Sequence, residues 1–342
     1  MTTDNNQYQL TAAEEAALAA YLLGIDSLGT MNERGLPSTK DFWLIPGLVA
    51  STNTFLYGQS KAGKSYLVAQ IVRAVATGED LLGRSPVRSG VKTLIVTTDA
   101  GSRIEYQDRL NKLGVPGDRV FILEAGVGLG REDWLDLRTF IEGAGIGLAV
   151  FDHATDLVEG EINQREGWRE LWHRIAGVGE GVARILVGHA TDSRHEGKPI
   201  KRPMGNAAAT QYARARVNLF APGGVDNPVR ELEVVSNNAV AEKLVCRTNS
   251  EGFLVLDAQA TEEQAEAAPR KRDAAKLRVE ELIRQLAASP SAPRGTQAEV
   301  WEWIAEQPGV VSVDGGKLTP RTIRAKIGRS GLAWDRENRR YF

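Results

Sequence analysis

One octapeptide, from Gly58 to Ser65, joins two glycines, a lysine and a serine at the spacing G-x-x-x-x-G-K-[ST]. This spacing is typical of a P-loop, in which backbone N–H groups and the positive end of a following helix surround a phosphate. Glycine at positions 58 and 63 would let the backbone approach the phosphates without a Cβ in the way. We therefore predict a nucleotide site formed by Gly58, Gln59, Ser60, Lys61, Ala62, Gly63, Lys64, Ser65 and Tyr66.

The chemistry predicted for this loop is that of an ATP and Mg²⁺ site. Lys64 would lie between the β- and γ-phosphate oxygens, and the Ser65 hydroxyl would be a ligand of Mg²⁺. The neighbouring segments fit, because residues 54–57 are typical of a short buried strand and residues 66–76 of a helix. A chance match in a glycine-rich chain would lack this strand–loop–helix context.

Apolar runs and helical segments alternate after the P-loop. The predicted strands cover residues 91–98, 120–123, 148–151 and 184–188, and the predicted helices cover residues 103–113, 133–142 and 165–175. Such alternation predicts an α/β domain with a mostly parallel sheet flanked by helices. Three later strands, at residues 217–220, 229–235 and 252–256, are expected to be antiparallel at the sheet edge.

Three polar residues follow predicted strands, at the edge where parallel sheets bind their ligands. Asp152 is the natural Walker B carboxylate and would hold Mg²⁺ together with Ser65; its alternative role is to cap the next segment. Asp99 is predicted to position or deprotonate the attacking water, unless it is a helix N-cap. His189 would sense the γ-phosphate, or else be a loop histidine. With Lys64, these three are the predicted catalytic residues.

The composition narrows the class of protein. The 342 residues are 42% hydrophobic and 25% charged, as in a soluble globular protein. The single cysteine, Cys246, excludes a disulfide framework and a cysteine zinc site, and its strand-like surroundings predict a buried thiol. His153, His173 and His195 are too scattered to predict a metal site. Because the sequence shows neither a long apolar run nor a signal-peptide pattern, we expect a cytoplasmic protein with no membrane contact.

The net charge of −2 is unevenly distributed, because the C-terminal residues 270–342 are basic. Residues 270–342 contain fifteen Lys or Arg and nine Asp or Glu, so the rest of the chain carries roughly −8. A basic domain beside an acidic body predicts contact with nucleic acid. A second basic segment, residues 192–203, is predicted to track single-stranded DNA, with a solvated surface loop as the alternative. Its predicted contact residues are Arg194, Lys198, Lys201 and Arg202.

The tail itself is predicted to be a small winged helix-turn-helix domain that binds duplex DNA, or alternatively a protein-interaction domain. Three helices are expected: the first from Lys271 to Ala288, the second capped at Thr296 and continuing to Glu306, and the third from Thr319 to Ser330. A terminal hairpin is expected to follow them. The last helix would enter the DNA groove. Its basic residues are Arg321, Arg324, Lys326 and Arg329.

These segments divide the chain into four parts. Residues 1–39 would hold an N-terminal helix, capped at Thr11 and suited to packing or a subunit contact, and a loop. Residues 40–258 would form the ATPase domain, residues 259–269 a linker, and residues 270–342 the DNA-binding domain.

The order of the motifs in residues 40–258 resembles that of the RecA-like ATPases related to RepA, the hexameric replicative helicases of plasmids and phages. The matching segments are Asp41–Gly47, Gly78 to Gly83, Phe151-Asp152, Gly188-His189 and Gly205–Ala209 leading into Val217–Leu219. The resemblance implies a RecA-like P-loop NTPase fold and a homo-oligomer, a hexameric ring with the nucleotide between subunits. It also implies that loops in the central channel bind single-stranded DNA.

This sequence departs from the family at three places. The family usually has Glu where Asp99 stands, its strand-end histidine pair is reduced to Gly188-His189, and its Lys-Asn pair reads Ser236-Asn237. Arg214 or Arg216 could replace the missing lysine at a neighbour's nucleotide.

Two functions therefore stay open. The first is a DNA-dependent ATPase motor that acts in replication or recombination of a phage, plasmid or other mobile element. The second is an ATP-gated DNA-binding or helicase-loader protein with slow hydrolysis and no strand separation, which Asp99 and Ser236 favour. A small-molecule kinase would need an arginine-rich lid that the sequence does not show, and it would leave the tail unexplained.

Overall fold

A computed structural model describes residues 10–342 apart from residues 36–37, 127, 192–193, 196–197, 200–201 and 314. The side chains of residues 192–200 and 268–272 also lie outside the description. By their contacts the residues form two compact units. The first consists of Met1–Glu242 and Cys246–Leu256, and the second of Lys243–Val245 and Asp257–Phe342. The division lies beside the boundary predicted at residue 258.

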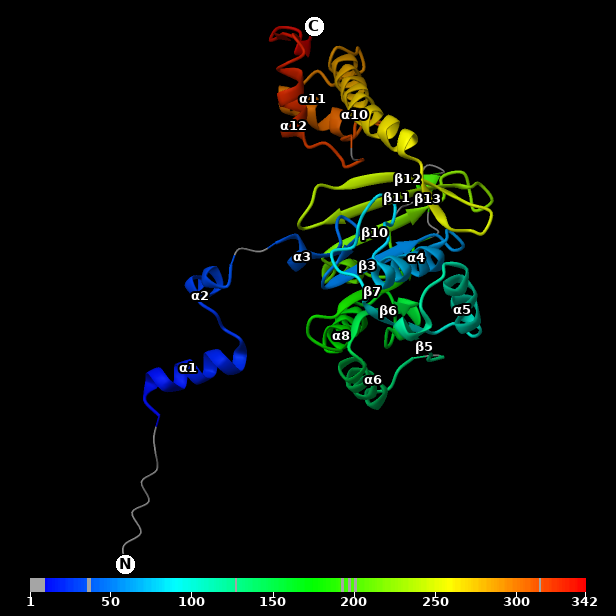
Figure 1. Cartoon of the computed structure of the whole chain (residues 1–342). Helices are drawn as coiled ribbons and strands as arrows, with labels where there is room; N and C mark the ends of the chain where they lie inside the picture. Colours follow the sequence, from blue (N-terminus) through cyan, green and yellow to red (C-terminus); the bar gives the residue numbers. More distant parts are fainter. Residues whose placement is uncertain are drawn as a thin grey trace, which may run out of the picture. The chain divides into compact units, whose positions relative to one another are not determined.

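A nine-stranded sheet organises the first unit, in the order β13-β12-β11-β10-β3-β7-β6-β4-β5 (Figure 1). The six strands from β10 to β5 pair in parallel, whereas the β10–β11 and β12–β13 pairs are antiparallel. The strands are β3 (Asn53–Gly58), β4 (Lys92–Thr97), β5 (Val120–Glu124), β6 (Ile146–Asp152), β7 (Ala183–His189), β10 (Ala215–Phe220), β11 (Val229–Ser236), β12 (Glu242–Thr248) and β13 (Leu254–Leu256). The predicted α/β class with a mostly parallel sheet is confirmed.

Strand β10 differs from the expectation for the late strands. We expected an antiparallel edge strand, but β10 lies inside the sheet and runs parallel to β3, with Val217 opposite Leu56. The reason is that β10 begins at the amino end of the sheet, where Ala215 lies opposite Thr54 of β3. There the Arg214 N–H donates to the carbonyl oxygen of Asn53, at 2.8 Å. The strand that precedes the P-loop therefore has a parallel neighbour on each side.

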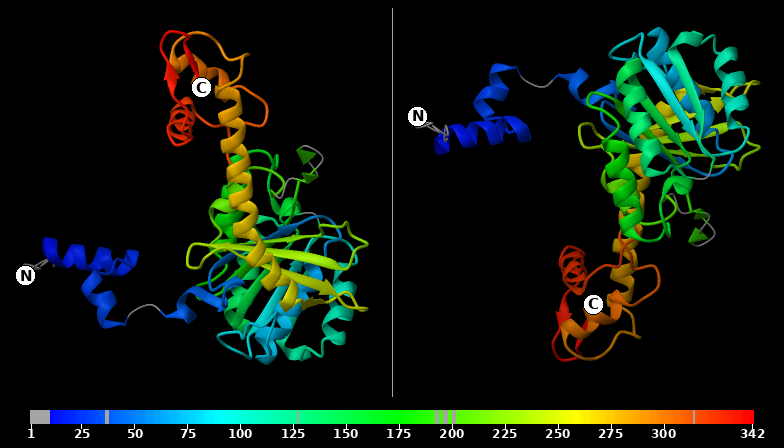
Figure 2. Two further views of the ribbon diagram at one scale, coloured as in Figure 1. Left: turned by 90° about the horizontal axis from the view of Figure 1, so that it is seen from above. Right: turned by 90° about the horizontal axis from the view of Figure 1, so that it is seen from below.

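Helices cover both faces of the sheet (Figures 1 and 2). They are α4 (Lys64–Thr77), α5 (Ser102–Lys112), α6 (Arg131–Ala144) and α8 (Arg165–Ala176), each within two residues of its predicted bounds. Trp134 of α6 and Trp168 and Trp172 of α8 pack with Phe55 and Phe151 in one core cluster. Helices α4 and α5 pack against each other on the other face.

Shorter elements complete the first unit: β1 (Trp43–Ile45), β2 (Val49–Ala50), η1 (Gly117–Arg119), α7 (Ala154–Leu157), β8 (Arg194–His195), β9 (Lys198–Pro199), α9 (Ala208–Gln211) and the N-terminal helices α1 (Ala12–Leu23), α2 (Leu28–Glu33) and α3 (Thr39–Phe42). The capping box predicted at Thr11 is confirmed, because its hydroxyl accepts from the Glu14 N–H and the Glu14 carboxylate accepts from the Thr11 N–H. Cys246 is fully buried in β12, opposite Leu256. Within the described residues, no helix is long and apolar enough to cross a membrane.

In its described residues, the second unit contains three helices followed by a two-stranded hairpin after Asp257. These are α10 (Ala258–Ala287), α11 (Gln297–Ala305), α12 (Pro320–Ile327), β14 (Trp334–Asp335) and β15 (Arg340–Tyr341). Ile283, Ile304, Ile323 and Tyr341 meet in its own small core. The caps predicted at Thr296 and Thr319 are present: each side chain accepts a backbone N–H three residues later.

Two predictions for this unit differ from the structure. Residues 259–269 are not a separate linker but the beginning of α10, because Asp257 caps the helix and the Ala, Glu and Gln that follow favour it. Helix α12 ends at Ile327 instead of Ser330, so Arg329 follows the helix.

Candidate nucleotide site

The P-loop connects the end of β3 to the start of α4. Gly63 takes the left-handed conformation, with φ 104°, and is the N-cap of α4. Gly58 lies against β10 so closely that a Cβ at this position would be 2.0 Å from the Leu219 carbonyl oxygen. Both positions therefore require glycine, one for its conformation and the other for the close approach of a neighbouring strand.

Lys64 is held at the base of this loop. Its Nζ donates to the carbonyl oxygens of Gly58, at 3.1 Å, and of Gln59, at 3.0 Å, and only 6% of the residue is exposed. Burial lowers the pKa of Lys64 to about 8, although the carboxylate of Asp152 opposes the shift. The ammonium group is thus poorly hydrated, which suits it to bind an anion.

Asp152, the last residue of β6, accepts two hydrogen bonds at one oxygen. The Ser65 hydroxyl donates to its Oδ2 at 3.1 Å, and the Tyr106 hydroxyl donates to the same atom at 2.6 Å. Burial alone would raise the pKa of Asp152, but His153, Tyr106 and Ser65 together keep it below its usual value. The group is therefore a carboxylate at neutral pH.

The second oxygen of Asp152 fits a metal ion. Among the described residues Oδ1 accepts no hydrogen bond, although it is buried. The His153 Nδ1 lies 3.0 Å away as an ion pair, without the geometry of a hydrogen bond. A buried carboxylate oxygen that accepts no hydrogen bond from the described residues, beside the hydroxyl of Ser65, offers oxygen ligands that suit Mg²⁺. The two predicted metal ligands thus lie together and fit the ion.

Asp99 follows β4 and contacts a histidine that the sequence analysis did not select. The His153 Nε2 lies 2.7 Å from the Asp99 Oδ2. The ion pair with Asp152, with a further contribution from Asp99, raises the pKa of His153 to about 9 against the effect of burial. The imidazolium therefore bridges the two acids that end β6 and β4. Asp99 does not cap α5, since the N-cap of that helix is Gly101.

His189 completes the group at the end of β7. Its Nδ1 lies 3.4 Å from the Lys64 Nζ, and its ring centroid lies 4.6 Å from that of His153. Burial, followed by the positive charges of Lys64 and His153, lowers the pKa of His189. A neutral imidazole beside the P-loop lysine can donate or accept a hydrogen bond at a phosphate.

Sequence reasoning missed two members of this site. Tyr106 is 1% exposed, and in the sequence it looks like a packing residue of α5, because it lies four positions before the buried Leu110. His153 was considered in the sequence only as a possible metal ligand, together with His173 and His195, and not as a partner of the strand-end acids. Its position directly after a strand-end acid is the signal that could have selected it.

The predicted DNA contacts fall into two groups. In the first unit the side chains of Arg194, Lys198 and Lys201 lie outside the described residues, and Arg202 is exposed. In the second unit Arg321 and Arg329 are exposed.

Two basic residues of α12 contact their own unit. The Arg324 guanidinium lies over the Trp301 ring at 5.4 Å. The Lys326 Nζ pairs with the Glu280 carboxylate at 2.9 Å, and its side chain is only 12% exposed. Lys326 is therefore engaged within the fold, so a contact with DNA would require this pair to open.

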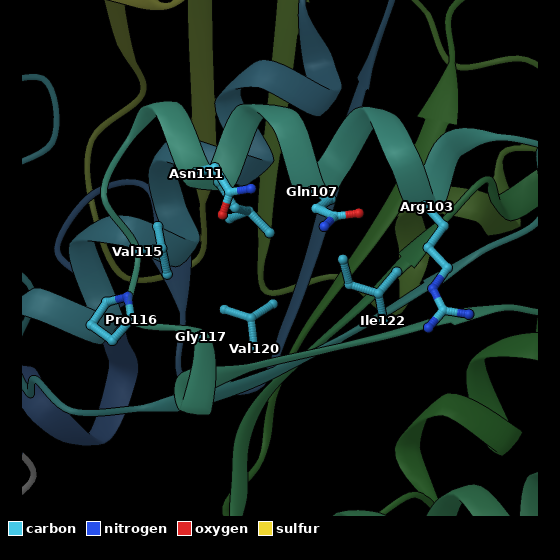
Figure 3. Close-up of a pocket in the computed structure, with 9 residues that line it drawn as sticks. Arg103, Gln107, Asn111, Val115, Pro116, Gly117, Val120 and Ile122 are labelled. Carbon is cyan, nitrogen blue, oxygen red and sulfur yellow. The ribbon is translucent and has the colours of Figure 1, made fainter.

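A separate hollow of about 330 Å³ lies between α5 and β5 (Figure 3). Its lining includes Arg103, Gln107, Asn111, Val120 and Ile122. These residues belong to β5 and to the side of α5 that faces it, and none of the residues that line the hollow belongs to the P-loop or is Asp99, Asp152 or His189. The hollow is therefore not the nucleotide site.

A P-loop at the carboxyl edge of a parallel sheet, with a buried acid at the end of a nearby strand, defines the class of the fold: a P-loop NTPase fold. Residues 31–194 match the family model described as an AAA domain, which supports an ATPase domain in this part of the chain.

One similar solved structure is the KaiC-like protein PH0186 from the hyperthermophilic archaeon Pyrococcus horikoshii OT3. It is 17% identical, and the match covers 65% of this chain and 96% of that chain with a TM-score of 0.44. A search of curated proteins found no match.

Proposed function

We propose that residues 40–258 bind ATP with Mg²⁺ and hydrolyse it. The observation that carries this proposal is the convergence of three residues at one sheet edge. Lys64 and Ser65 come from the P-loop and Asp152 from β6, and the Ser65 hydroxyl lies 3.1 Å from the Asp152 carboxylate. A buried lysine for the phosphates and a hydroxyl–carboxylate pair for a divalent cation are the groups that phosphoryl transfer at a P-loop needs.

Each converging residue has a role in the proposed reaction. Bound Mg²⁺ would neutralise charge on the phosphate oxygens. Lys64 would exchange its backbone carbonyl partners for phosphate oxygens, and Asp152 would hold the metal. Asp99 would orient the attacking water while His153 fixes its carboxylate, and His189 would contact the γ-phosphate. Hydrolysis would then depend on position and charge, with little covalent chemistry for the protein to perform.

We further propose that the ATPase acts on DNA, as a motor of RepA type in replication or recombination of a phage, plasmid or other mobile element. Two features support this. The tail has an excess of basic residues, and α10–α12 with the β14–β15 hairpin follow the order of a winged helix-turn-helix. A homo-oligomer, in the form of a hexameric ring, would place loops such as residues 192–203 around single-stranded DNA.

Replacement of Lys64 by alanine tests the nucleotide site. Lys64→Ala removes the charge that would face the phosphates and leaves the apolar strands intact, so we expect loss of ATP binding in a folded protein. Calorimetric titration with MgATP and a circular dichroism spectrum measure the two properties. Unchanged affinity in the folded variant would contradict the P-loop assignment.

Truncation after Leu256 tests the division of DNA contacts, because the second unit has its own core. We expect the truncated protein to keep ATP-dependent single-strand binding and to lose duplex binding, both measured at one salt concentration. Full duplex affinity without the second unit would make that unit a protein-interaction domain.

A second function, an ATP-gated DNA-binding or loader protein with slow hydrolysis, is favoured by one observation. The Asp99 carboxylate is shorter than glutamate and is engaged by His153 at 2.7 Å. The two functions differ in the ATPase rate with and without single-stranded DNA, measured beside a strand-separation assay. A motor is stimulated by DNA and separates strands, whereas a loader hydrolyses slowly in both conditions and separates none.

A further inference from the structure

Arg230, near the start of β11, is a buried arginine bonded to backbone carbonyls. Only 5% of the residue is exposed. Its Nε donates to the Ala62 carbonyl at 2.9 Å, its Nη1 to the carbonyls of Val229, at 2.9 Å, and Asn227, and its Nη2 to the Val225 carbonyl at 2.9 Å. The fixed fork of the guanidinium thus meets four carbonyl oxygens, which a lysine could not satisfy in the same way.

These carbonyls belong to two different segments. Ala62 is in the P-loop, two residues before Lys64, and is fully buried. Val225, Asn227 and Val229 belong to the connection between β10 and β11 and to the start of β11. A second bond joins the same segments, because the Gln59 side-chain oxygen accepts from the Ala221 N–H at 3.1 Å. The P-loop is therefore attached at two points to residues 221–229.

The bond to Ala62 fixes the direction of one P-loop amide. In a planar trans peptide the C=O and the following N–H point in opposite directions. Because the Ala62 carbonyl points to Arg230, the Gly63 N–H points away from Arg230. Since backbone N–H groups of a P-loop bind phosphate oxygens, the orientation of this amide contributes directly to phosphate affinity.

We propose that Arg230 is a positioning residue for phosphate binding, which holds the Ala62–Gly63 peptide so that its N–H is ready for the phosphate. This inference rests on the proposed nucleotide binding. Loss of Arg230 then weakens the binding of ligands that carry a β-phosphate and leaves the contribution of the nucleoside unchanged, because Ala62 is the P-loop residue to which Arg230 donates.

The chain contains a matched control for this idea. Arg184 is also a buried arginine of the sheet, 8% exposed, and it donates to the carbonyls of Ala176, at 3.0 Å, and Gly179. It lies near the start of β7, at the opposite end of the strands from the P-loop. A comparison of Arg230→Lys with Arg184→Lys therefore separates the cost of disturbing a buried guanidinium from the effect on the P-loop.

The test measures affinity for MgATP, MgADP and adenosine by calorimetry in the full chain. Relative to Arg184→Lys, we expect Arg230→Lys to bind MgATP and MgADP about tenfold more weakly, a change of about 1.4 kcal/mol, and adenosine equally. Equal MgATP affinity in the two folded variants overturns the inference. A wild-type protein that binds no nucleotide contradicts the proposed function instead, so the two failures are distinguishable.

Hydrogen exchange gives a readout that needs no ligand. In the absence of nucleotide we expect the Gly63 amide to exchange faster in Arg230→Lys than in Arg184→Lys. If Arg230→Lys does not fold, Asn227→Ala replaces it, because this exposed side chain accepts from the Val229 N–H at 2.8 Å and so supports the carbonyls around Arg230. In Asn227→Ala we expect faster exchange of the Gly63 amide and weaker MgATP binding, each changed by less than in Arg230→Lys. If neither the exchange rate nor the MgATP affinity changes in Asn227→Ala, the inference is overturned.

Discussion

The acids that end β6 and β4 lie at the same edge of the sheet but have different surroundings. The Asp152 side chain is 5% exposed and accepts hydrogen bonds from Ser65 and Tyr106. The Asp99 side chain is 59% exposed and pairs with His153. A carboxylate packed among several donors is fixed before any ligand binds, whereas one in water can still move. The first environment suits a metal ligand, and the second suits a group that adjusts to substrate and water.

The largest effect should follow from Asp152→Asn, which tests the buried side of this comparison. The amide keeps the size and can still accept from Tyr106, but it holds a metal ion poorly. We expect ATP hydrolysis to fall by about 1,000-fold or more, as the loss of several kcal/mol of metal stabilisation implies. Steady-state rates over a Mg²⁺ titration measure this. A variant with a normal rate and normal Mg²⁺ dependence would show that the metal ligand lies elsewhere.

Asp99→Asn tests the exposed side. The amide can no longer accept a proton or attract the imidazolium of His153, so we expect the hydrolysis rate to fall by about 100-fold. MgATP affinity should remain within about twofold of the wild type, because Asp99 is not a predicted phosphate or metal contact. The measurement compares kcat with the dissociation constant from calorimetry. Unaffected turnover would place the water-positioning group elsewhere.

Tyr106→Phe sharpens the comparison, since it removes one donor from Asp152 and leaves Asp99 untouched. Hydrogen bonds to a metal-binding carboxylate typically change metal affinity by 10–100-fold, and we expect about tenfold weaker apparent Mg²⁺ affinity. The buried ring stays in place, so the fold should persist. The control is Tyr212→Phe, at a side chain 38% exposed. Equal Mg²⁺ dependence in both variants would mean that Tyr106 only fills space.

The smallest expected effect is a change in stability with pH that depends on His153, which contacts both Asp152 and Asp99. Its folded pKa of about 9 lies above the ordinary 6.5, first because of Asp152 and also because of Asp99. Its stabilisation is therefore complete below about pH 6.5 and disappears as the pH rises through about 9. We measure the free energy of unfolding in urea, without Mg²⁺, as a function of pH. Between about pH 6.5 and about pH 9, we expect this free energy to fall in the wild type relative to His153→Gln. His173→Gln, at an exposed position of α8, should retain the wild-type profile.

The sequence was sufficient for much of the fold because most parallel strands are buried on both faces. Each reads as a short apolar run, and the acid or histidine that ends it identifies the ligand edge of the sheet. Asp152 and His189 were found by this rule. Strand direction was harder to predict: β10 carries the same apolar signal as its neighbours, and its direction depends on the end of the sheet at which it begins, which an apolar run does not indicate.

Residues whose role depends on a distant backbone group could not be predicted in this way. Arg230 stands in a strand that also contains Glu231 and Glu233, so the charge pattern does not distinguish it as buried. Its carbonyl partners include Ala62, far earlier in the chain. Tyr106 occupies a helical position that packing alone would explain. In both cases the signal lies in three-dimensional proximity, which neither periodicity nor spacing contains.

Because Cys246 is buried, the separation of the late strands of the sheet can be measured by the chemical labelling of its thiol. Its thiol is the only one in the sequence and is 0% exposed in β12. A thiol reagent can therefore react only when the late strands separate, and the labelling rate at low denaturant measures how often they do so. Adding nucleotide during such an experiment would show whether ligand at the P-loop slows the separation of strands elsewhere in the same sheet.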